Sequence, residues 1–428
     1  MTSLTSAPSL DATVNTEIGQ RLYFLDWLRI LAFALLLLYH VGMYYVSWYW
    51  HVKSPFASTL LEPFMRLSSP WRMSVLFLVS GAATAFMLNK QGASGALLRQ
   101  RAVRLLVPLL FGILVIVPPQ SYFEVVQRLH FRGDYIDFMA LYLRGYGGFC
   151  GANKHCLILP TWNHLWFLPY LFSYTALLWL MIRVHQTTFG RASDYLAGSL
   201  RGAGLLLLPI GYLACTRLAL QSRFPITNAL VGDWFAHSQY LALFLLGVVL
   251  ARAPRLWPRF EQLRWLAIAL ALLAWTYLVG RSDNVTQSGN MTPWDSALRA
   301  IMYSIQQWSA IVGALGFAHR YLNRDSAARV YLTQAVFPIY ILHQTVIILL
   351  AISLAPLALI PAIEAPLLIG ATLVIALLGF ELIRRSTWLR PLFGLARSGD
   401  LGSAQSDLGK IWFALSHKCR ERLARRGA

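Results

Sequence analysis

Charged residues are scarce in this 428-residue sequence. They make up 13% of the chain, roughly half of the share of about 25% found in soluble globular proteins. Hydrophobic residues make up 57% of the chain. This composition excludes an ordinary soluble globular protein. It predicts a polytopic helical membrane protein, in which each helix satisfies its own backbone inside the bilayer.

Acidic residues are also few. The chain has 18 Asp and Glu against 37 Lys and Arg, which gives a formal net charge of +19. Such an excess can indicate nucleic-acid binding, but here the basic residues gather between apolar runs, where they set membrane topology. The chain lacks a P-loop, a Rossmann fingerprint, an HExxH motif and a G-x-S-x-G motif. It also shows no internal repeat and no separate soluble domain.

Only four cysteines occur. Cys150 and Cys156 flank the polar loop sequence GFCGANKHC, Cys215 lies in an apolar run and Cys419 lies in a basic tail. In an extracytoplasmic loop, Cys150 and Cys156 form either a disulfide or two unpaired thiols, and the spacing leaves both alternatives open. A zinc site there is disfavoured because His155 is the only further ligand between them. We expect no metal.

Apolar runs bounded by charges, Pro or Gly predict an all-α transmembrane bundle of about ten spans. Residues 1–20 have no basic segment followed by an apolar run, so we expect a disordered cytoplasmic tail and not a signal peptide. Residues 21–385 form the membrane domain and 386–428 a basic cytoplasmic tail. In that tail, 407–428 is either an amphipathic surface helix or only a topogenic segment. The expected spans are 27–48, 71–89, 104–122, 163–182, 202–220, 237–252, 264–280, 298–318, 333–355 and 363–383.

The positions of Lys and Arg predict the orientation. If the N-terminus is cytoplasmic and the spans alternate, more than twice as many Lys and Arg fall inside as outside. This bias places both termini in the cytoplasm. Topology also accounts for the net charge, so nucleic-acid binding is not needed to explain it.

The first span, in RLYFLDWLRILAFALLLLYHVGMYYVSWYW at 21–50, carries three polar side chains on one stripe: Asp26, Arg29 and His40. Ionisable groups at such positions are functional or join helices. Asp26 and Arg29 lie at the cytoplasmic edge and predict an ion pair. His40 lies twelve or thirteen residues into the span, near the middle of the membrane. It is either a packing residue or a catalytic one.

A second histidine lies at similar depth in FPIYILHQTVII. His343 is about ten residues into its span, Tyr340 is one turn below it, and Gln344 is adjacent. The sequence does not show whether His343 shares a cavity with His40. If it does, His343, Tyr340 or a backbone group would complete the site, because Asp26 is roughly 21 Å from His40 along the helix.

Three other positions have both a structural and a substrate-binding interpretation. Ser80 and Gly81 at the centre of the second span allow close helix packing or leave room for a thin ligand. Arg72, near the outer end of that span, either holds an anionic group or snorkels to the interface. His164, at the outer start of the fourth span, either faces substrate or belongs to an aromatic belt.

Arg101 and Arg104 lie three residues apart at the cytoplasmic mouth of the third span. A cluster of this kind is suited to bidentate recognition of phosphates. The positive-inside bias explains the same residues without a ligand. Composition alone does not separate these two interpretations.

Taken in order, several motifs resemble those of the acyltransferase 3 family of integral membrane acyltransferases. The PWRM segment before F-L-V-S-G, and FPIYILHQT near the end, are most similar to the glucan-modifying (succinyltransferase) members. The resemblance covers about 21–385. The motifs are RLYFLDW at 21–27, Arg29-x10-His40, F-L-V-S-G at 77–81, R-x-x-R-L-x-x-P at 101–108, H-L-W-F-L at 164–168 and Y-I-L-H at 340–343.

The resemblance implies an inner-membrane enzyme that moves an acyl group, acetyl or succinyl, from cytoplasmic acyl-CoA to hydroxyls of an extracytoplasmic glucan or other carbohydrate. It implies that His40 is the essential histidine, that Arg29 belongs to the R-x10-H motif and that Arg101 and Arg104 handle acyl-CoA. Imidazole titrates near neutral pH and suits the base that this reaction needs. Whether His40 acts as base or forms an acyl-imidazole stays open.

From the residues themselves, we expect His343 to be a second catalytic group and Arg72, Ser80, His164 and Tyr340 to face substrate. Two competing hypotheses remain. Ten helices with buried histidines also suit a proton-coupled transporter of a small anionic or glycan-related solute, although no inverted repeat is visible. The second competing hypothesis is a noncatalytic subunit of a glycan-export complex.

Overall fold

The computed structural model describes residues 22–151, 156–281 and 292–396. The predicted N-terminal tail and the predicted surface helix at 407–428 lie outside the described residues. The described chain is helical and carries two isolated β-bridges but no strand. Its helices are α2 (Tyr23–Tyr45), α3 (Glu62–Ser68), α4 (Arg72–Gln91), α5 (Gly95–Phe111), the π-helix η1 (Gly112–Ile116), α6 (Pro118–Leu129), α7 (Tyr135–Leu143), the 3₁₀-helix η2 (Asn163–Trp166), α8 (Phe167–Ser199), α9 (Gly204–Leu220), α10 (Trp234–Arg252), the 3₁₀-helix η3 (Pro254–Leu256), α11 (Trp257–Gly280), α13 (Pro293–Leu322), α14 (Ala327–Leu354), the 3₁₀-helix η4 (Ala355–Leu357), α15 (Pro361–Arg385) and α16 (Leu389–Leu392).

Each of the ten expected spans overlaps a described helix. Eight helical segments are long and apolar enough to cross a membrane, whereas α9 is a shorter apolar helix. The third expected span is continuous in sequence, but the structure builds it from α5, η1 and the start of α6. The number of spans and the cytoplasmic placement of both termini stay predictions.

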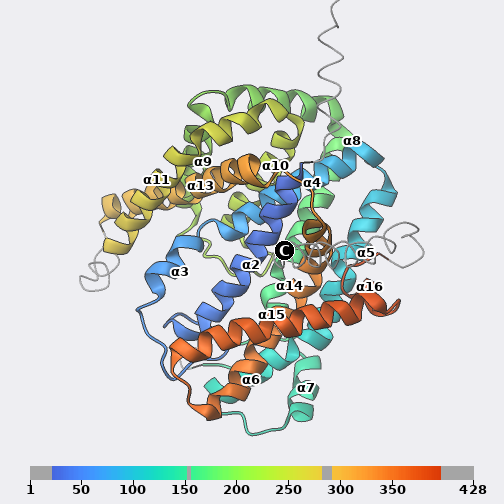
Figure 1. Cartoon of the computed structure of the whole chain (residues 1–428), viewed down its shortest axis with the longest axis vertical. Coiled ribbons are helices and arrows are strands. Elements are labelled where there is room, and N and C mark those ends of the chain that lie inside the picture. The colour runs from blue at the N-terminus through green and yellow to red at the C-terminus, as the bar shows by residue number, and fades with distance from the viewer. Residues whose placement is uncertain (1–21, 152–155, 282–291, 397–428) are drawn as a thin grey trace, which may run out of the picture.

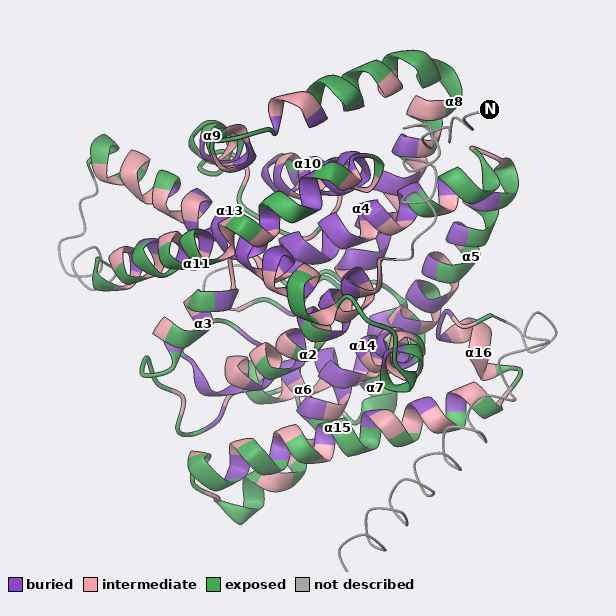
Figure 2. Ribbon diagram, turned by 45° about the horizontal axis from the view of Figure 1, so that its top comes forward, coloured by how far each residue is buried: buried purple, intermediate pink, exposed green. Residues whose placement is uncertain are grey.

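The outer surface of the bundle is apolar. Figure 2 shows buried residues concentrated in central helices such as α4 and exposed residues along α15. Leu273 on α11 is 68% exposed, and Leu378 and Leu382 on α15 are 64% and 65% exposed. Exposed leucines along whole helices are unfavourable in water and favourable in lipid. The predicted all-α, polytopic membrane bundle is therefore confirmed.

Two glycines let α4 and α10 pack backbone against backbone. A Cβ on Gly81 would lie 1.9 Å from the carbonyl oxygen of Phe244, and one on Gly247 would lie 1.9 Å from that of Leu78. No side chain fits at either position, so small residues permit the close approach. This bears out the packing interpretation of Gly81.

The first and ninth expected spans lie side by side in the centre of the bundle. Figure 1 shows α2 and α14 next to each other, and α15 packs against both. The chain turns sharply after α2, because the Lys53 ammonium donates to the carbonyls of Met43 (2.6 Å) and Val46 (2.5 Å) at the end of that helix. A positive charge at this end is favourable for the helix dipole.

Cys150 and Cys156 form a disulfide, one of the two alternatives left open by the sequence. The surrounding loop has its own apolar cluster, in which Phe138 and Tyr142 of α7 are fully buried. Cys215 carries a free, exposed thiol. Cys419 lies outside the described residues.

Candidate active site

The structure brings His40 and His343 into direct contact. His40 projects from α2 and His343 from α14, and His40 Nδ1 lies 2.7 Å from His343 Nε2. Their rings are stacked with centroids 5.0 Å apart. The sequence predicted two histidines at similar depth, and packing of α2 against α14 places them together.

The hydrogen-bond partners define which nitrogens carry protons. His343 Nδ1 lies 2.6 Å from the backbone carbonyl of Tyr340. A carbonyl only accepts, so His343 Nδ1 donates, and in the neutral ring Nε2 must accept from His40 Nδ1–H. His40 is then left with a lone pair on Nε2. The pair therefore presents one unprotonated imidazole nitrogen, with a second imidazole and a carbonyl behind it to stabilise an added proton.

His164 supports this pair from η2. Its Nε2 donates to the carbonyl of Ile341 (3.0 Å), and its Nδ1 accepts from the Gln120 side-chain amide (3.3 Å). The Tyr340 hydroxyl donates to the backbone carbonyl of His164 (2.6 Å). Both ring nitrogens of His164 are thus used by the protein, and its ring holds α14 in place.

Gln120 is fully buried and is the centre of a polar network. Its Nε2 donates to Thr345 Oγ1 (2.7 Å), and its Oε1 accepts from Asn163 (3.1 Å) and from Gln344 (3.0 Å). Thr345 in turn donates to the carbonyl of Ile116 (2.7 Å), the last residue of η1. The π-helix and the following Pro118 leave carbonyls without helical partners, and α14 uses one of them. Buried networks with satisfied partners hold side chains rigidly.

His40 borders a polar cavity of about 320 Å³. Its wall is formed by residues of α2, α4, α10, α14 and η2, of the turn before α4 and of the loops 46–61 and 221–233. The positive-inside bias of the sequence predicts that these two loops lie on the extracytoplasmic side. The wall includes His40, His51, Arg72, Asn163, His164 and Gln344.

Arg72 is the cation of this cavity. Its guanidinium carbon lies 3.2 Å from the centroid of the Tyr39 ring, a cation–π contact. Its Nε and Nη1 are buried and have no hydrogen-bond partner, and no carboxylate of the described residues forms a salt bridge with it. A buried cation without an acidic partner is unfavourable, so this position favours an anionic ligand.

His40 lies nearer to the outer end of its helix than expected. The expected span ran to residue 48, but α2 ends at Tyr45, only five residues after His40. The chain leaves the helix there because loop residues, Lys53 among them, satisfy its last carbonyls. The imidazole is therefore accessible from the outer cavity.

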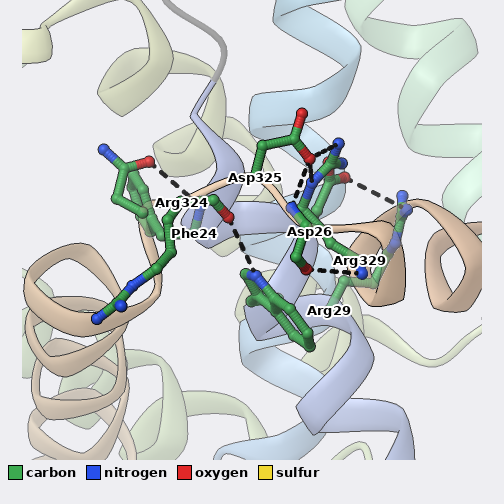
Figure 3. Close-up of polar contacts among 9 residues, drawn as sticks. Phe24, Asp26, Arg29, Arg324, Asp325 and Arg329 are labelled. Carbon is green, nitrogen blue, oxygen red and sulfur yellow. Dashed lines mark hydrogen bonds and ion pairs between the residues drawn. The ribbon is translucent and has the colours of Figure 1, made fainter. Parts of the chain in front are cut away.

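Asp26 joins α2 to α14 at the opposite end. Figure 3 shows it among Arg29, Asp325 and Arg329. Asp26 lies 2.6 Å from Arg329 and 3.5 Å from Arg29, so the predicted ion pair with Arg29 is present but is the longer of the two. Arg329, whose side chain is 2% exposed, also binds Asp325 at 2.8 Å.

The two links between α2 and α14 are equally spaced. Fourteen residues separate Asp26 from His40, and fourteen separate Arg329 from His343. Fourteen residues are close to four helical turns, so each pair lies on one face of its helix, about 21 Å apart. The ion pair and the imidazole pair together fix the rotation and the axial register of the two helices.

The comparison with known proteins identifies the family. A sequence model of the family's acyltransferase domain matches residues 22–381. The chain belongs to the acyltransferase 3 family. It is 26% identical over 336 residues to "Glucans biosynthesis protein C" of Escherichia coli strain K12, and the match covers 77% of this chain and 83% of that protein. The protein of the same name from Escherichia coli O9:H4 strain HS gives the same identity and coverage. No solved structure matches the chain.

The sequence and the helices together show a multi-pass membrane acyltransferase of this family. Arg29, Arg101 and Arg104, the candidates for its donor site, lie close enough for their charges to interact. Arg101 is buried and donates to the Thr84 hydroxyl of α4, whereas Arg104 is exposed. Arg29 is paired with Asp26 at 3.5 Å, and the three positive charges gathered here favour a polyanionic ligand. Within the described ranges, no three His, Cys, Asp or Glu side chains are grouped as a metal site.

Two of the expected substrate-facing residues lie away from the cavity of this acyltransferase. Ser80 lies in the second expected span but not in the cavity wall, and its carbonyl accepts from Thr84. Tyr340 is 2% exposed and acts through its carbonyl and hydroxyl on His343 and His164. Arg72 and His164 do line the cavity.

Sequence analysis missed Gln120, Arg329 and the pair His51 and Glu124. Gln120 follows two prolines at the end of an apolar run, where an amide looks like an ordinary interface residue. Glu124 was a lone acid at the outer edge of the third span, and acids at such positions are costly unless they have a partner. The isolated acid Glu124 was therefore the signal in the sequence that pointed to a buried partner.

Proposed function

We propose that this chain transfers an acyl group from cytoplasmic acyl-CoA to a hydroxyl of an extracytoplasmic glucan or related carbohydrate, in the inner membrane. The single observation that carries the proposal is the His40–His343–Tyr340 carbonyl relay at a cavity whose wall lies on the predicted outer side. The name of the Escherichia coli relative supports a glucan as acceptor.

In this mechanism His40 acts as general base. His40 Nε2 takes the proton of the acceptor hydroxyl while the oxygen attacks the thioester carbonyl carbon. The new C–O bond forms, the C–S bond breaks, and the proton passes to the departing CoA thiolate. His343 accepts part of the positive charge through the 2.7 Å hydrogen bond, and the Tyr340 carbonyl orients it.

The donor enters from the cytoplasmic side, where Arg29, Arg101 and Arg104 bind its phosphates. The eleven residues from Arg29 to His40 span about 16 Å of helix. A donor that bridges this distance needs a long, thin arm between its phosphates and its acyl group, and coenzyme A has one. No metal takes part in these steps.

Arg72 selects an acidic acyl group such as succinyl over acetyl. Its guanidinium has no acidic partner in the cavity, and a terminal carboxylate would supply one. Arg72→Gln should reduce transfer from succinyl-CoA more than transfer from acetyl-CoA. Equal losses with both donors would contradict this selectivity.

The test of the main proposal is His40→Ala in the full chain, reconstituted in vesicles with acyl-CoA on one side and glucan on the other. We expect a loss of about 100- to 10,000-fold, the usual contribution of a general base. Acylation that persists in a properly inserted variant overturns the assignment. Solute accumulation in vesicles without CoA would favour a transporter instead.

A further inference from the structure

A second imidazole borders the cavity that holds His40. His51 lies in the loop after α2, and its Nδ1 is 2.5 Å from Oε2 of Glu124 on α6. Glu124 also accepts a hydrogen bond from the Tyr49 hydroxyl. The Glu124 side chain is 3% exposed, and that of His51 is 14% exposed. A buried carboxylate therefore orients an imidazole ring that reaches the cavity.

The carboxylate also defines the tautomer of His51. Glu124 accepts, so His51 Nδ1 carries the proton, and Nε2 of the neutral ring has the lone pair. No side chain or carbonyl of the described residues bonds to this Nε2. His51 and His40 are thus alike: each has its Nδ1 bound by protein and its Nε2 left for a ligand in the same cavity.

The loop does not need His51 for its attachment to α6. The backbone N–H of Lys53 donates to Gln127 Oε1 (2.9 Å), and Gln127 Nε2 donates to the Lys53 carbonyl (3.2 Å). The Lys53 ammonium also caps α2. Burying the Glu124 carboxylate costs free energy. The contacts of Lys53 already anchor the loop, so anchoring does not explain why this carboxylate is buried. A carboxylate and an imidazole paired beside a cavity indicate a ligand site.

We propose that the His51–Glu124 dyad is the subsite that holds the carbohydrate acceptor, an inference that rests on the proposed function. His51 Nε2 accepts a hydrogen bond from a sugar hydroxyl next to the reacting one, which leaves the reacting hydroxyl at His40. The expected ligand is a neutral polyhydroxylated ring, because hydroxyl donors suit a lone pair. Trp50 and Trp166 in the same wall supply aromatic faces, and Asn228 supplies a further amide.

The position of the dyad favours the acceptor over the donor. His51 lies beyond the end of α2. Arg29 lies eleven residues before His40 on the same helix, and Arg101 and Arg104 of α5, the other arginines expected to bind the donor, are near it. Arg72 is the charged group of the cavity and suits the acyl carboxylate. The dyad offers a hydrogen-bond acceptor without a free positive charge, and this matches a neutral sugar.

The test measures binding and kinetics separately. Purified full-length protein in nanodiscs is titrated with a short β-linked glucan oligosaccharide, without acyl donor, and tryptophan fluorescence is followed. His51→Ala should weaken the Kd for the oligosaccharide about tenfold, as expected for one hydrogen bond to a polarised group. In the transfer assay, it should raise the KM for glucan by a similar factor and change the KM for acyl-CoA less than twofold.

His319→Ala is the matched control. His319 Nδ1 also lies near a glutamate, 3.1 Å from Glu261 Oε2, but away from the cavity, and its loss should leave the Kd unchanged. If His51→Ala fails to fold, Glu124→Gln keeps the shape of the dyad and should weaken binding as well.

An unchanged Kd for the oligosaccharide in the folded variant overturns the subsite. Oligosaccharide binding that depends on His51, in a protein that transfers no acyl group, would keep the subsite and overturn the proposed function. Acyl transfer by a protein whose affinity for glucan does not depend on His51 would keep the proposed function and overturn the subsite.

Discussion

Replacing Arg329 by Gln should disturb the two histidines although the substitution lies about 21 Å below them along the helix. Arg329 is the buried half of the ion pair that links α14 to Asp26 of α2. Without it, the imidazole contact, apolar packing and two long hydrogen bonds from α2 to residues 323 and 324, both 3.4 Å, remain to keep the axial register of these helices. A small sliding or rotation would then separate His40 Nδ1 from His343 Nε2.

The size of the effect follows from exposure and partners. Removing one partner of a fully buried ion pair costs about 3–5 kcal/mol. Here Asp26 is 18% exposed and keeps Arg29, while Asp325 is 52% exposed and rehydrates. The loss should therefore be smaller, about 2 kcal/mol, near that of a hydrogen bond between charged groups. Turnover should fall about 10- to 100-fold, as misplacement of reacting groups by 1 Å does.

The assay combines a thermal melt in detergent with steady-state transfer from acyl-CoA to glucan. Arg329→Gln should lower the Tm by a few degrees and kcat strongly, with little change in the KM for glucan. Arg329→Lys keeps the charge but not the fork of the guanidinium, so it should recover part of the turnover. As a control, Asp295→Asn breaks the exposed ion pair with Arg281 and should change neither quantity measurably.

Two results would refute the reasoning. An unchanged Tm for Arg329→Gln would show that the ion pair does not stabilise the helix pair. A lowered Tm with wild-type kcat, measured where the variant is folded, would show that the register of α2 and α14 does not depend on it.

Three further predictions concern the packing, the outer loop and the α2 cap. Gly81→Ala should push α4 away from α10 and lower the free energy of unfolding by about 1–3 kcal/mol, as followed by a thermal melt. Gly211→Ala is the control: its Cβ would meet open space, so the substitution should be neutral or stabilising. Alkylation of intact protein before and after reduction should label Cys150 and Cys156 only after reduction, which is expected for an extracytoplasmic loop; labelling without reduction would contradict this. Burial lowers the pKa of Lys53 to about 8, below the value of about 10.4 for the unfolded chain. The folded protein should therefore become more stable as the pH rises between these two values. Thermal melts across this pH range should show the gain in the wild type and not in Lys53→Met.

The sequence by itself determined the class of structure and the family. The scarcity of charge and the apolar runs require helices in a membrane, because a helix satisfies its own backbone hydrogen bonds. The length of each apolar run can be read directly from the sequence. The depth of His40 and His343, the small Gly81 and the ordered motifs are also local features. The Asp26–Arg29 contact is three residues apart on one helix, and that spacing was enough to predict it.

Tertiary structure decided what these residues touch. His40 and His343 are 303 positions apart, and Asp26 and Arg329 are likewise 303 apart. Which two of many apolar helices lie side by side depends on the packing of all of them, and lipid-facing and protein-facing leucines look alike in sequence. The cavity, the network around Gln120 and the His51–Glu124 dyad arise where separate helix ends and loops meet. Helical periodicity places a side chain on a face, but only the assembled bundle determines what that face contacts.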